Sequence, residues 1–352
     1  MANQNTQKLV LVTGGSGFVG SHCILQLLNA GYSVRTTLRS LRRKDELVEA
    51  LQKGGAKEVE NLSFVEADLS RDANWDEAVK NCDYVLHVAS PITLARPKDE
   101  TELIGPGVEG TLRVLRASRD AGVKRVVLTS SFGAIGYGHK PTEIPFTEDT
   151  WTDTNYKGIS AYVKSKTLAE KAAWDFIRNE GGGLELSVIN PTGIFGPLIG
   201  SNVTSSLQII QQLMTGALKA TPQMNFGIVD VRDVADAHLR AMEIEEAKGQ
   251  RFILQAGKTL SMHEVAMILR ERLGDKAWRV PTKVMPNFVV RVLGLFNSTA
   301  RTIVPQLGQV KNASSEKARK ILGWEPRTNE EAIVASAESV VRLGLDNNPD
   351  GN

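Results

Sequence analysis

Cysteine is scarce in this chain of 352 residues, and long hydrophobic runs are missing. Its two cysteines, Cys23 and Cys82, form no CxxC pair, which argues against a metal framework and favours a reducing compartment. The most apolar late stretch, Val284–Phe296, contains polar residues and is shorter than the roughly 20 residues of a membrane-spanning helix. The net charge of +2 is too small for a typical nucleic-acid binder. Since the N-terminus also lacks a signal-peptide pattern, we expect a cytoplasmic protein with no metal, membrane or nucleic-acid partner.

Short apolar segments alternate with helical patterns through the first half of the chain. Alternation of this kind predicts a parallel sheet that is covered by helices on both faces, a Rossmann-type doubly wound α/β fold. The expected strands are Lys8–Thr13, Ser33–Leu38, Leu62–Ala67, Tyr84–Val88 and Arg125–Thr129, and the expected helices are Phe18–Ala30, Arg43–Gln52, Trp75–Lys80, Val108–Ala121 and Ala161–Arg178.

The pattern changes after Pro191, where helical segments dominate and only one further strand candidate, Arg251–Gln255, is found. No repeat or low-complexity linker separates the two parts. We therefore expect a dinucleotide-binding domain over residues 1–190 that carries the catalytic groups. A smaller, mostly helical substrate-binding region should cover residues 191–345, threaded partly back onto the first domain, with a loose tail at 346–352.

A glycine-rich segment, Thr13–Gly20, joins the first expected strand to the first expected helix. Gly15, Gly17 and Gly20 fit the pattern GxGxxG, and Gly14, Gly17 and Gly20 fit GxxGxxG equally well. Either spacing permits a tight turn and lets the backbone approach a pyrophosphate at the helix N-terminus. The alternative is an ordinary turn, but the strand before it and the helix after it favour a dinucleotide site.

The end of the second strand distinguishes between the two nicotinamide dinucleotides. Proteins that bind NAD place an acidic residue there, to hold the ribose 2′-hydroxyl. This chain has Arg39 and further cations up to Lys44, with no acid before Asp45. The cations could simply be a solvated start of the next helix, but arginine is well suited to a 2′-phosphate. We expect NADP(H) as the cofactor.

A tyrosine and a lysine four residues apart open the long helical segment at Ala161. Tyr162 and Lys166 share one helix face, where the ammonium would lower the tyrosine pKa from its ordinary value of about 10. The pair could arise by chance, with a packed tyrosine beside an exposed lysine. However, Ser131 follows the strand that ends at Thr129, at the sheet edge where ligands bind. Together these residues favour carbonyl chemistry.

In this order the motifs resemble the extended short-chain dehydrogenases/reductases, in particular the subgroup of dihydroflavonol, cinnamoyl-CoA and microbial aldehyde or methylglyoxal reductases. The likeness covers about residues 8–345. Besides the segments above, it rests on residues 34–39, 67–69, 87–91, 110–111, 190–197, 230–235 and 317–326.

The resemblance implies a catalytic triad of Ser131, Tyr162 and Lys166. Arg39, assisted by Lys44, would hold the 2′-phosphate. The other implied cofactor contacts are Gly14, Ser16, Gly17, Phe18, Val19, Gly20, Asp68, Leu69, Val88, Ala89, Ser90, Pro191, Thr192, Gly193, Ile194 and Ser206, together with Tyr162 and Lys166.

The implied reaction is hydride transfer from NADPH to an aldehyde or ketone, with Tyr162 as proton donor and Ser131 polarising the carbonyl oxygen. Plant dihydroflavonol reductases carry a substrate-reading Asn where this chain has Gly136, which disfavours flavonoid substrates. The segments expected to read the substrate are Pro91–Pro97, Phe132–Tyr156, Phe195–Met224 and a helix over Val284–Thr302.

Two other functions are compatible with the glycine loop. A sugar-nucleotide epimerase or dehydratase shares the Tyr/Lys pair but retains NAD, which Arg39 disfavours. A non-catalytic regulator that senses the dinucleotide needs no proton donor, whereas this chain carries all three residues of the triad. In each case a monomer or a homodimer is compatible with the sequence.

Overall fold

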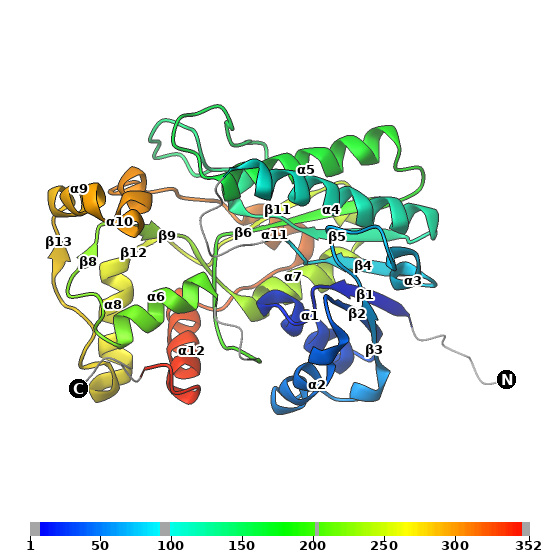
Figure 1. Ribbon diagram of the computed structural model, residues 1–352, viewed down its shortest axis with the longest axis horizontal. Coiled ribbons are helices and arrows are strands. Elements are labelled where there is room, and N and C mark those ends of the chain that lie inside the picture. Colours follow the sequence, from blue (N-terminus) through cyan, green and yellow to red (C-terminus); the bar gives the residue numbers. More distant parts are fainter. Residues whose placement is uncertain (1–7, 92–98, 201–203, 347–352) are drawn as a thin grey trace.

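The computed structural model describes residues 8–91, 99–200 and 204–346 of the chain (Figure 1). Its centre is a seven-stranded sheet in the order β11-β6-β5-β4-β1-β2-β3, in which every neighbouring pair is parallel. The predicted Rossmann-type fold is thereby confirmed. The strands are β1 Leu9–Thr13, β2 Ser33–Leu38, β3 Leu62–Glu66, β4 Tyr84–His87, β5 Arg125–Thr129, β6 Glu185–Pro191 and β11 Arg251–Leu254.

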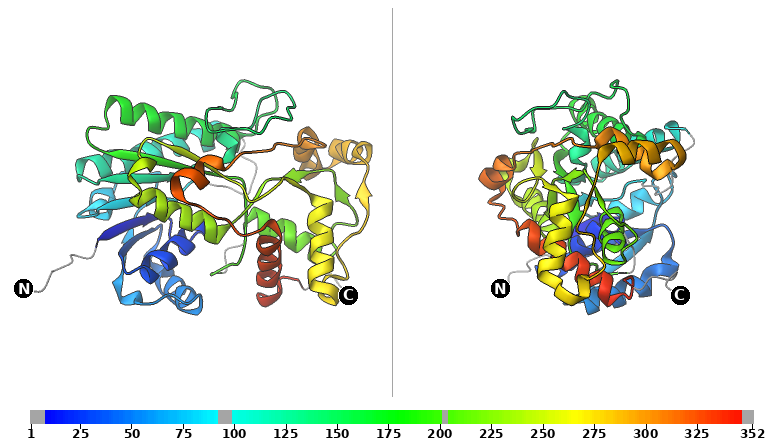
Figure 2. Two further views of the ribbon diagram at one scale, coloured as in Figure 1. Left: turned by 180° about the vertical axis from the view of Figure 1, so that it is seen from behind. Right: turned by 90° about the vertical axis from the view of Figure 1, so that its left-hand side faces the viewer.

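Two hydrophobic cores cover the two faces of this sheet. Val10 and Val12 of β1 point into one core and Leu11 into the other, as the alternation of side chains along a strand requires. The first core is closed by helices α1 Phe18–Asn29, α2 Lys44–Lys53, α7 Val231–Glu243 and α11 Glu316–Leu322, and the second by α3 Trp75–Val79, α4 Thr101–Asp120 and α5 Ala161–Asn179. Figure 2 shows the two layers from behind and from one side.

The two cysteines lie in opposite cores, Cys23 in the first and Cys82 in the second, and both are buried free thiols. Burial raises the pKa of Cys82 to about 11, which keeps the thiol protonated and unreactive. Within the described ranges no helix is long and apolar enough to cross a membrane.

The C-terminal part contains more strands than we expected. Prediction found only one after Pro191, because strands of two or three residues are too short to show a period. These strands form three two-stranded sheets around a third core that α6, α8 and α12 share. The remaining elements of this part are β7 Gly193–Phe195, α6 Ser205–Met214, β8 Thr221–Pro222, β9 Asn225–Phe226, β10 Ile228–Asp230, β12 Leu260–Ser261, α8 Met262–Leu273, β13 Val284–Met285, α9 Asn287–Phe296, α10 Ser298–Ile303 and α12 Asn329–Arg342, with 3₁₀ turns at Glu245–Ala247, Gly274–Ala277 and Val304–Gln306. The earlier part of the chain has 3₁₀ turns at Leu41–Arg43, Val59–Asn61 and Phe132–Ala134.

The single helix expected over Val284–Thr302 is wrong. The segment is divided into β13, α9 and α10. Pro286 precedes α9, and Asn297 begins α10 by accepting the Ala300 N–H at 3.0 Å through its side chain. An N-cap of this kind starts a new helix rather than continuing the previous one.

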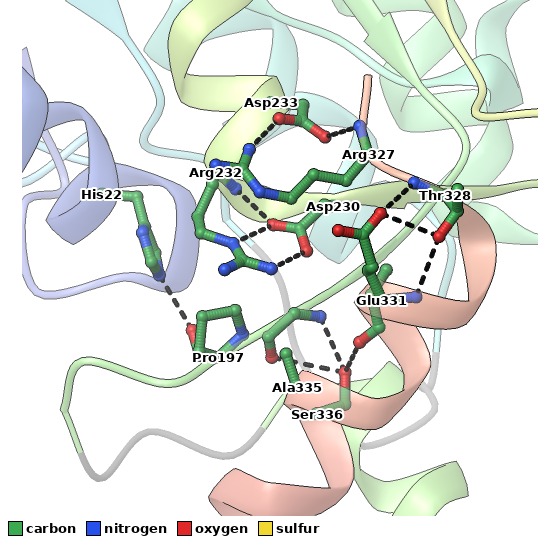
Figure 3. A network of polar contacts seen from close by, with 12 residues as sticks. His22, Pro197, Asp230, Arg232, Asp233, Arg327, Thr328, Glu331, Ala335 and Ser336 are labelled. Atoms are coloured by element: carbon green, nitrogen blue, oxygen red, sulfur yellow. Dashed lines mark hydrogen bonds and ion pairs between the residues drawn. The ribbon is translucent and has the colours of Figure 1, made fainter. Parts of the chain in front are cut away.

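The chain returns to the sheet twice after residue 191. Strand β11 pairs with β6, and α7 packs against α1. A polar network fastens α12 and the segment before it to these elements (Figure 3). Asp233 on α7 pairs with Arg327, and its carbonyl accepts the Trp324 indole N–H at 2.9 Å. Ser336 on α12 accepts the Gly196 N–H at 2.7 Å. The segment before α12 is therefore fastened to α7, and α12 itself to the segment that follows β7.

Candidate active site

The glycine loop between β1 and α1 has the geometry of the pattern GxxGxxG. Gly14 has a φ of +71°, a left-handed conformation, and its carbonyl accepts the Gly17 N–H at 2.9 Å. A Cβ on Gly20 would collide with that carbonyl. Gly15 is required for a different reason, because a Cβ there would collide with Thr36 of β2. The turn thus depends on Gly14, Gly17 and Gly20.

The first turn of α1 offers backbone N–H groups to an anion. Gly17 is its N-cap and supplies no side-chain acceptor, and the first turn has no acidic residue. Phe18 is half-buried, whereas Val19 is buried in the first core and anchors the turn. Ser16 lies in the loop itself and is half-buried. Because the helix N-terminus also carries a partial positive charge, the loop fits the pyrophosphate of a dinucleotide.

The end of β4 forms the neighbouring wall of this site. The Thr13 hydroxyl lies 2.8 Å from His87 Nδ1 and accepts the Ala89 N–H at 3.0 Å. A Cβ on Gly14 would lie 3.0 Å from Ala89, so the loop and the segment Val88–Ser90 are in close contact. All three residues of this segment are half-buried. They therefore border the switch between β1 and β4, where open α/β sheets bind ligands.

Cationic and acidic groups meet at the ends of β2 and β3. Arg39 is exposed, and its charge contributes to a lowered pKa of Asp68, after the larger effect of hydrogen bonds from Ser70. Lys44 begins α2, with its ammonium 5.4 Å from the centroid of the Phe64 ring. Leu69 is half-buried beside Gly110. The two cations predicted to hold a 2′-phosphate thus lie on this edge, close to the loop expected to border adenine.

The structure brings Ser131, Tyr162 and Lys166 together. Ser131 is the second residue after β5, and its hydroxyl accepts the Gly133 N–H at 3.0 Å. The Tyr162 hydroxyl, in the first turn of α5, faces Ser131, and hydrogen bonding to that serine lowers the tyrosine pKa against the effect of burial. One turn further along α5, the Lys166 ammonium donates to the Thr129 carbonyl at 3.0 Å. Both side chains of α5 therefore contact the carboxyl end of β5, as the spacing predicts.

Burial dominates the electrostatics of these groups. Tyr162 is 37 % exposed as a whole, yet burial of its hydroxyl raises its pKa, and the bond with Ser131 opposes this only in part. Burial also lowers the pKa of Lys166 to about 8, against the opposing charge of Glu170. The net direction for Tyr162 is opposite to the one expected from the Tyr162–Lys166 pair alone. The phenol is consequently protonated at neutral pH.

Beyond β6 the chain passes the sheet edge again. The Thr192 hydroxyl donates to the Leu254 carbonyl at 3.1 Å, and a Cβ on Gly193 would lie 2.9 Å from the Gly227 carbonyl. Pro191 ends β6 and is buried, while Ile194 in β7 is half-buried. The hydroxyl of Ser206, in the first turn of α6, donates to the Ile194 carbonyl. A phosphate contact by Ser206 stays a prediction.

Aromatic side chains pack behind the expected substrate loop. Phe132 contacts Tyr137 and Phe146 edge to face, at ring-centroid distances of 6.3 and 6.0 Å. A Cβ on Gly136 would collide with the Phe132 ring, so an asparagine cannot be placed there without moving that ring. The Lys311 ammonium, which the sequence did not single out, lies 4.8 Å from the Tyr137 ring centroid.

The other expected substrate segments are described only in part. Of the Pro91–Pro97 segment, residues 92–97 lie outside the described residues, as do 201–203 within Phe195–Met224 and 347–352 of the expected tail. Helix α9 packs against α10 and exposes Phe288, Leu295 and Phe296.

The fold and this arrangement define a dinucleotide-binding protein with a Ser/Tyr/Lys site of the extended short-chain dehydrogenase/reductase type. The chain belongs to the NAD dependent epimerase/dehydratase family, whose model matches residues 10–257. It is 37 % identical to the cinnamoyl-CoA reductase CAD2 of Medicago truncatula over 77 % of this chain and 82 % of that protein. It is 36 % identical to a dihydroflavonol 4-reductase of Hordeum vulgare, over 78 % of this chain and 77 % of that protein.

Solved structures show the same likeness. The yeast methylglyoxal/isovaleraldehyde reductase Gre2, solved in complex with NADPH, matches with a TM-score of 0.79 and 27 % identity. The match covers 96 % of this chain and 100 % of Gre2.

Proposed function

We propose that this chain is an NADPH-dependent reductase that converts an aldehyde or ketone into an alcohol. The observation that carries the proposal is the contact between the Ser131 and Tyr162 hydroxyls at the carboxyl end of β5, with Lys166 bonded to the same strand end. Related proteins include a cinnamoyl-CoA reductase, a dihydroflavonol reductase and an aldehyde reductase solved with NADPH.

The cofactor is held by the glycine loop and the basic edge of the sheet. Bound NADPH supplies a hydride to the carbonyl carbon of the substrate. We assign the pyrophosphate to the segment Gly14–Gly20 and the 2′-phosphate to Arg39 and Lys44. The remaining contacts that we propose are Asp68, Leu69, Val88, Ala89, Ser90, Tyr162, Lys166, Pro191, Thr192, Gly193, Ile194 and Ser206.

The side chains of the triad act on the carbonyl oxygen. Tyr162 is protonated at neutral pH, because burial raises its pKa, and so is ready to donate a proton to the developing alkoxide. Ser131 donates a second hydrogen bond to the same oxygen, and one such donor is worth about 2.7–4 kcal/mol in other enzymes. The Lys166 ammonium favours the tyrosinate that remains after proton transfer. The raised pKa of Tyr162 keeps the proton on the phenol at neutral pH, which is the form that reduction requires.

The substrate is proposed to bind between the sheet edge and residues 191–345, which we assign as the substrate-binding part of the chain, with residues 1–190 as the dinucleotide-binding part. Gly136 packs on the buried Phe132 ring, and the half-buried Tyr137 beside it is proposed to supply an apolar wall of the substrate site. An apolar wall suits aliphatic or aromatic aldehydes and α-dicarbonyls better than polyhydroxylated flavonoids. We also propose a cytoplasmic monomer or homodimer, in keeping with the two free thiols.

The decisive experiment follows NADPH consumption with a panel of aromatic aldehydes, aliphatic aldehydes and α-dicarbonyls. Wild-type protein should turn over at least one of them, and Tyr162→Phe should lower kcat by about 10²- to 10⁴-fold with little change in NADPH affinity. Near wild-type turnover by Tyr162→Phe would show that the acid assignment is wrong.

Two outcomes would favour the other functions instead. Purified protein that carries stoichiometric NAD and does not oxidise NADPH would indicate an epimerase or dehydratase. Tight NADPH binding without turnover of any carbonyl would indicate a regulator that senses the dinucleotide.

A further inference from the structure

A buried carboxylate lies one turn beyond Lys166 on α5. Tyr162, Lys166 and Glu170 follow at intervals of four residues and so share one face of the helix. The Glu170 side chain is fully buried, and both of its oxygens have partners. A buried charge is costly unless it is paired and hydrogen-bonded. Hydrophobic packing in the core does not by itself require a carboxylate at this position.

Three hydrogen bonds connect Glu170 to strands of the central sheet. The Ser130 hydroxyl donates to its carboxylate at 2.5 Å and the Asn190 side-chain amide at 2.7 Å. The Arg251 guanidinium donates at 2.5 Å from β11. Ser130 follows β5, Asn190 lies in β6 and Arg251 in β11, so Glu170 links α5 to three neighbouring strands of the sheet. These strands and α5 are labelled in Figure 1.

The same bonds determine where Ser131 lies. Lys166 binds the Thr129 carbonyl, Glu170 binds the Ser130 hydroxyl, and the Asn190 amide that binds Glu170 also donates to the Ser131 carbonyl at 3.2 Å. Three successive residues at the end of β5 are thereby fixed to α5. The Ser131 hydroxyl can meet the Tyr162 hydroxyl only if this strand end keeps its place.

Glu170 also acts on Lys166 through its charge. The two side chains border one small pocket, together with Ser90, Thr129 and Ser130. The carboxylate raises the pKa of Lys166, against the lowering caused by burial. The other titratable groups near Lys166 are His87 on β4 and Tyr162, while Arg251 lies beyond Glu170. Burial lowers the pKa of His87 to about 3, so its imidazole is neutral in the range where Lys166 titrates.

We propose that Glu170 is a positioning residue for the reduction, which holds the Ser131 strand end against α5 and keeps the Lys166 ammonium charged. The inference rests on the proposed roles of Ser131, Tyr162 and Lys166. A merely structural alternative is that Glu170 serves only to neutralise Arg251, and the two roles predict different behaviour of matched variants.

Glu170→Gln removes the charge while keeping the shape of the side chain. We expect kcat to fall at least about tenfold, while the NADPH dissociation constant, measured by fluorescence without substrate, stays within about threefold. Without the carboxylate the Lys166 pKa drops, so the basic limb of the kcat/KM profile should move to lower pH by at least about half a unit. Ser130→Ala keeps the charge, and should lower kcat without moving this limb.

Two further variants separate positioning from charge neutralisation. The double variant Glu170→Gln/Arg251→Met removes both buried charges and should restore thermal stability. Its kcat should stay low, and the basic limb of its kcat/KM profile should stay at the lower pH. Glu185→Gln is the matched control, because Glu185 also pairs with a buried arginine, Arg125 at 2.7 Å, but at the opposite end of β5 and β6. The Glu185→Gln variant should lose thermal stability and keep the wild-type pH profile of kcat/KM.

The outcomes distinguish this inference from the proposed function. If wild-type protein reduces no carbonyl, the proposed function fails. If it does, and the double variant regains wild-type kcat and pH dependence, Glu170 only neutralises Arg251 and the inference is overturned. If Glu170→Gln does not fold, the double variant and Ser130→Ala test the inference in its place. Wild-type kcat in both of these variants would overturn the inference.

Discussion

Arg39 is a single exposed side chain on which the choice of cofactor depends. Its neighbour Asp68 accepts hydrogen bonds from the backbone and hydroxyl of Ser70, and within the described residues no hydrogen bond or ion pair joins Arg39 to an acid. A phosphate placed there would receive charge-assisted hydrogen bonds, which contribute about 1.5–3 kcal/mol each. An unphosphorylated ribose would gain nothing comparable.

Arg39→Ala should therefore weaken NADPH binding by about 10- to 100-fold while leaving NADH binding nearly unchanged. KM values for the two cofactors with one aldehyde substrate provide the measurement. Arg42→Ala, which removes an exposed cation from the turn before α2, is the control and should change the NADPH KM only slightly. Equal losses for both cofactors in Arg39→Ala would contradict the assignment of the 2′-phosphate.

The protonation of Lys166 sets the pH dependence of the wild-type protein. The pKa of this lysine is lowered from its ordinary value to about 8, so the ammonium is present below that pH and is lost as the pH rises through it. Tyr162 stays protonated over the same range, because its pKa is raised. We expect kcat/KM for carbonyl reduction to decline as the pH passes about 8. A rate that stays constant through this range contradicts the role given to Lys166.

The contact between α4 and α5 shows how packing of helices supports the site. Gly107 lies so close to α5 that a Cβ there would collide with the Ser165 hydroxyl, and a Cβ on Gly110 would lie 2.9 Å from Leu69. Gly105, two residues earlier in the same helix, has open space around its Cβ position.

Gly107→Ala should lower the free energy of unfolding by about 1–3 kcal/mol, because the two helices must move apart. Gly105→Ala should leave it unchanged or raise it by up to about 1 kcal/mol, since alanine has the higher helix propensity. Urea unfolding of both variants measures the difference. Similar stability of the two would show that the approach of α4 to α5 is not tight.

Elements with a clear period were predictable from the sequence, and those shaped by distant contacts were not. Ser33–Leu38 and Arg125–Thr129 were predicted with their observed bounds. Helix α4 begins at Thr101 rather than Val108, because packing on α5 overrides the helix-breaking tendency of Gly105–Gly107. Strand β6 was missed, since Glu185, Ser187 and Asn190 interrupt its apolar run, so that it shows neither a continuous apolar segment nor a clear alternation.

The site could be predicted to a similar extent. Ser131, Tyr162 and Lys166 stand in recognisable local patterns. The order of strands and helices therefore predicted that the three side chains lie close together. Glu170 was missed, although its spacing from Lys166 is visible in the sequence, because only the fold shows that Asn190 and Arg251 reach it.

The molecule as a whole depends on contacts between α7 and the segment that precedes α12. Arg327 pairs with Asp233. Burial raises the pKa of Asp233, and Arg327 opposes this shift only in part. Thr328 and Glu331 then begin α12 with a reciprocal pair of side-chain caps. The ion pair between Arg327 and Asp233 is partly exposed, which limits its contribution to stability.

Arg327→Ala should lower the free energy of unfolding by about 1–2 kcal/mol, because Asp233 then lacks its cationic partner. Arg319→Ala, an exposed substitution on α11, should change it by no more than about 0.5 kcal/mol. Urea unfolding near neutral pH compares the two. Equal effects would show that the Arg327–Asp233 pair does not fasten the C-terminal segment.

The pairing of β11 with β6 also has a consequence for how the chain acquires its structure. The edge of the central sheet is completed only when residues 251–254 have been synthesised, about sixty residues after β6. Until then β6, which is buried in the finished protein, presents unpaired N–H and carbonyl groups that can pair with another chain. The nascent protein is therefore open to aggregation during a long interval of synthesis, and a chain that stops near residue 190 would retain this exposed edge permanently.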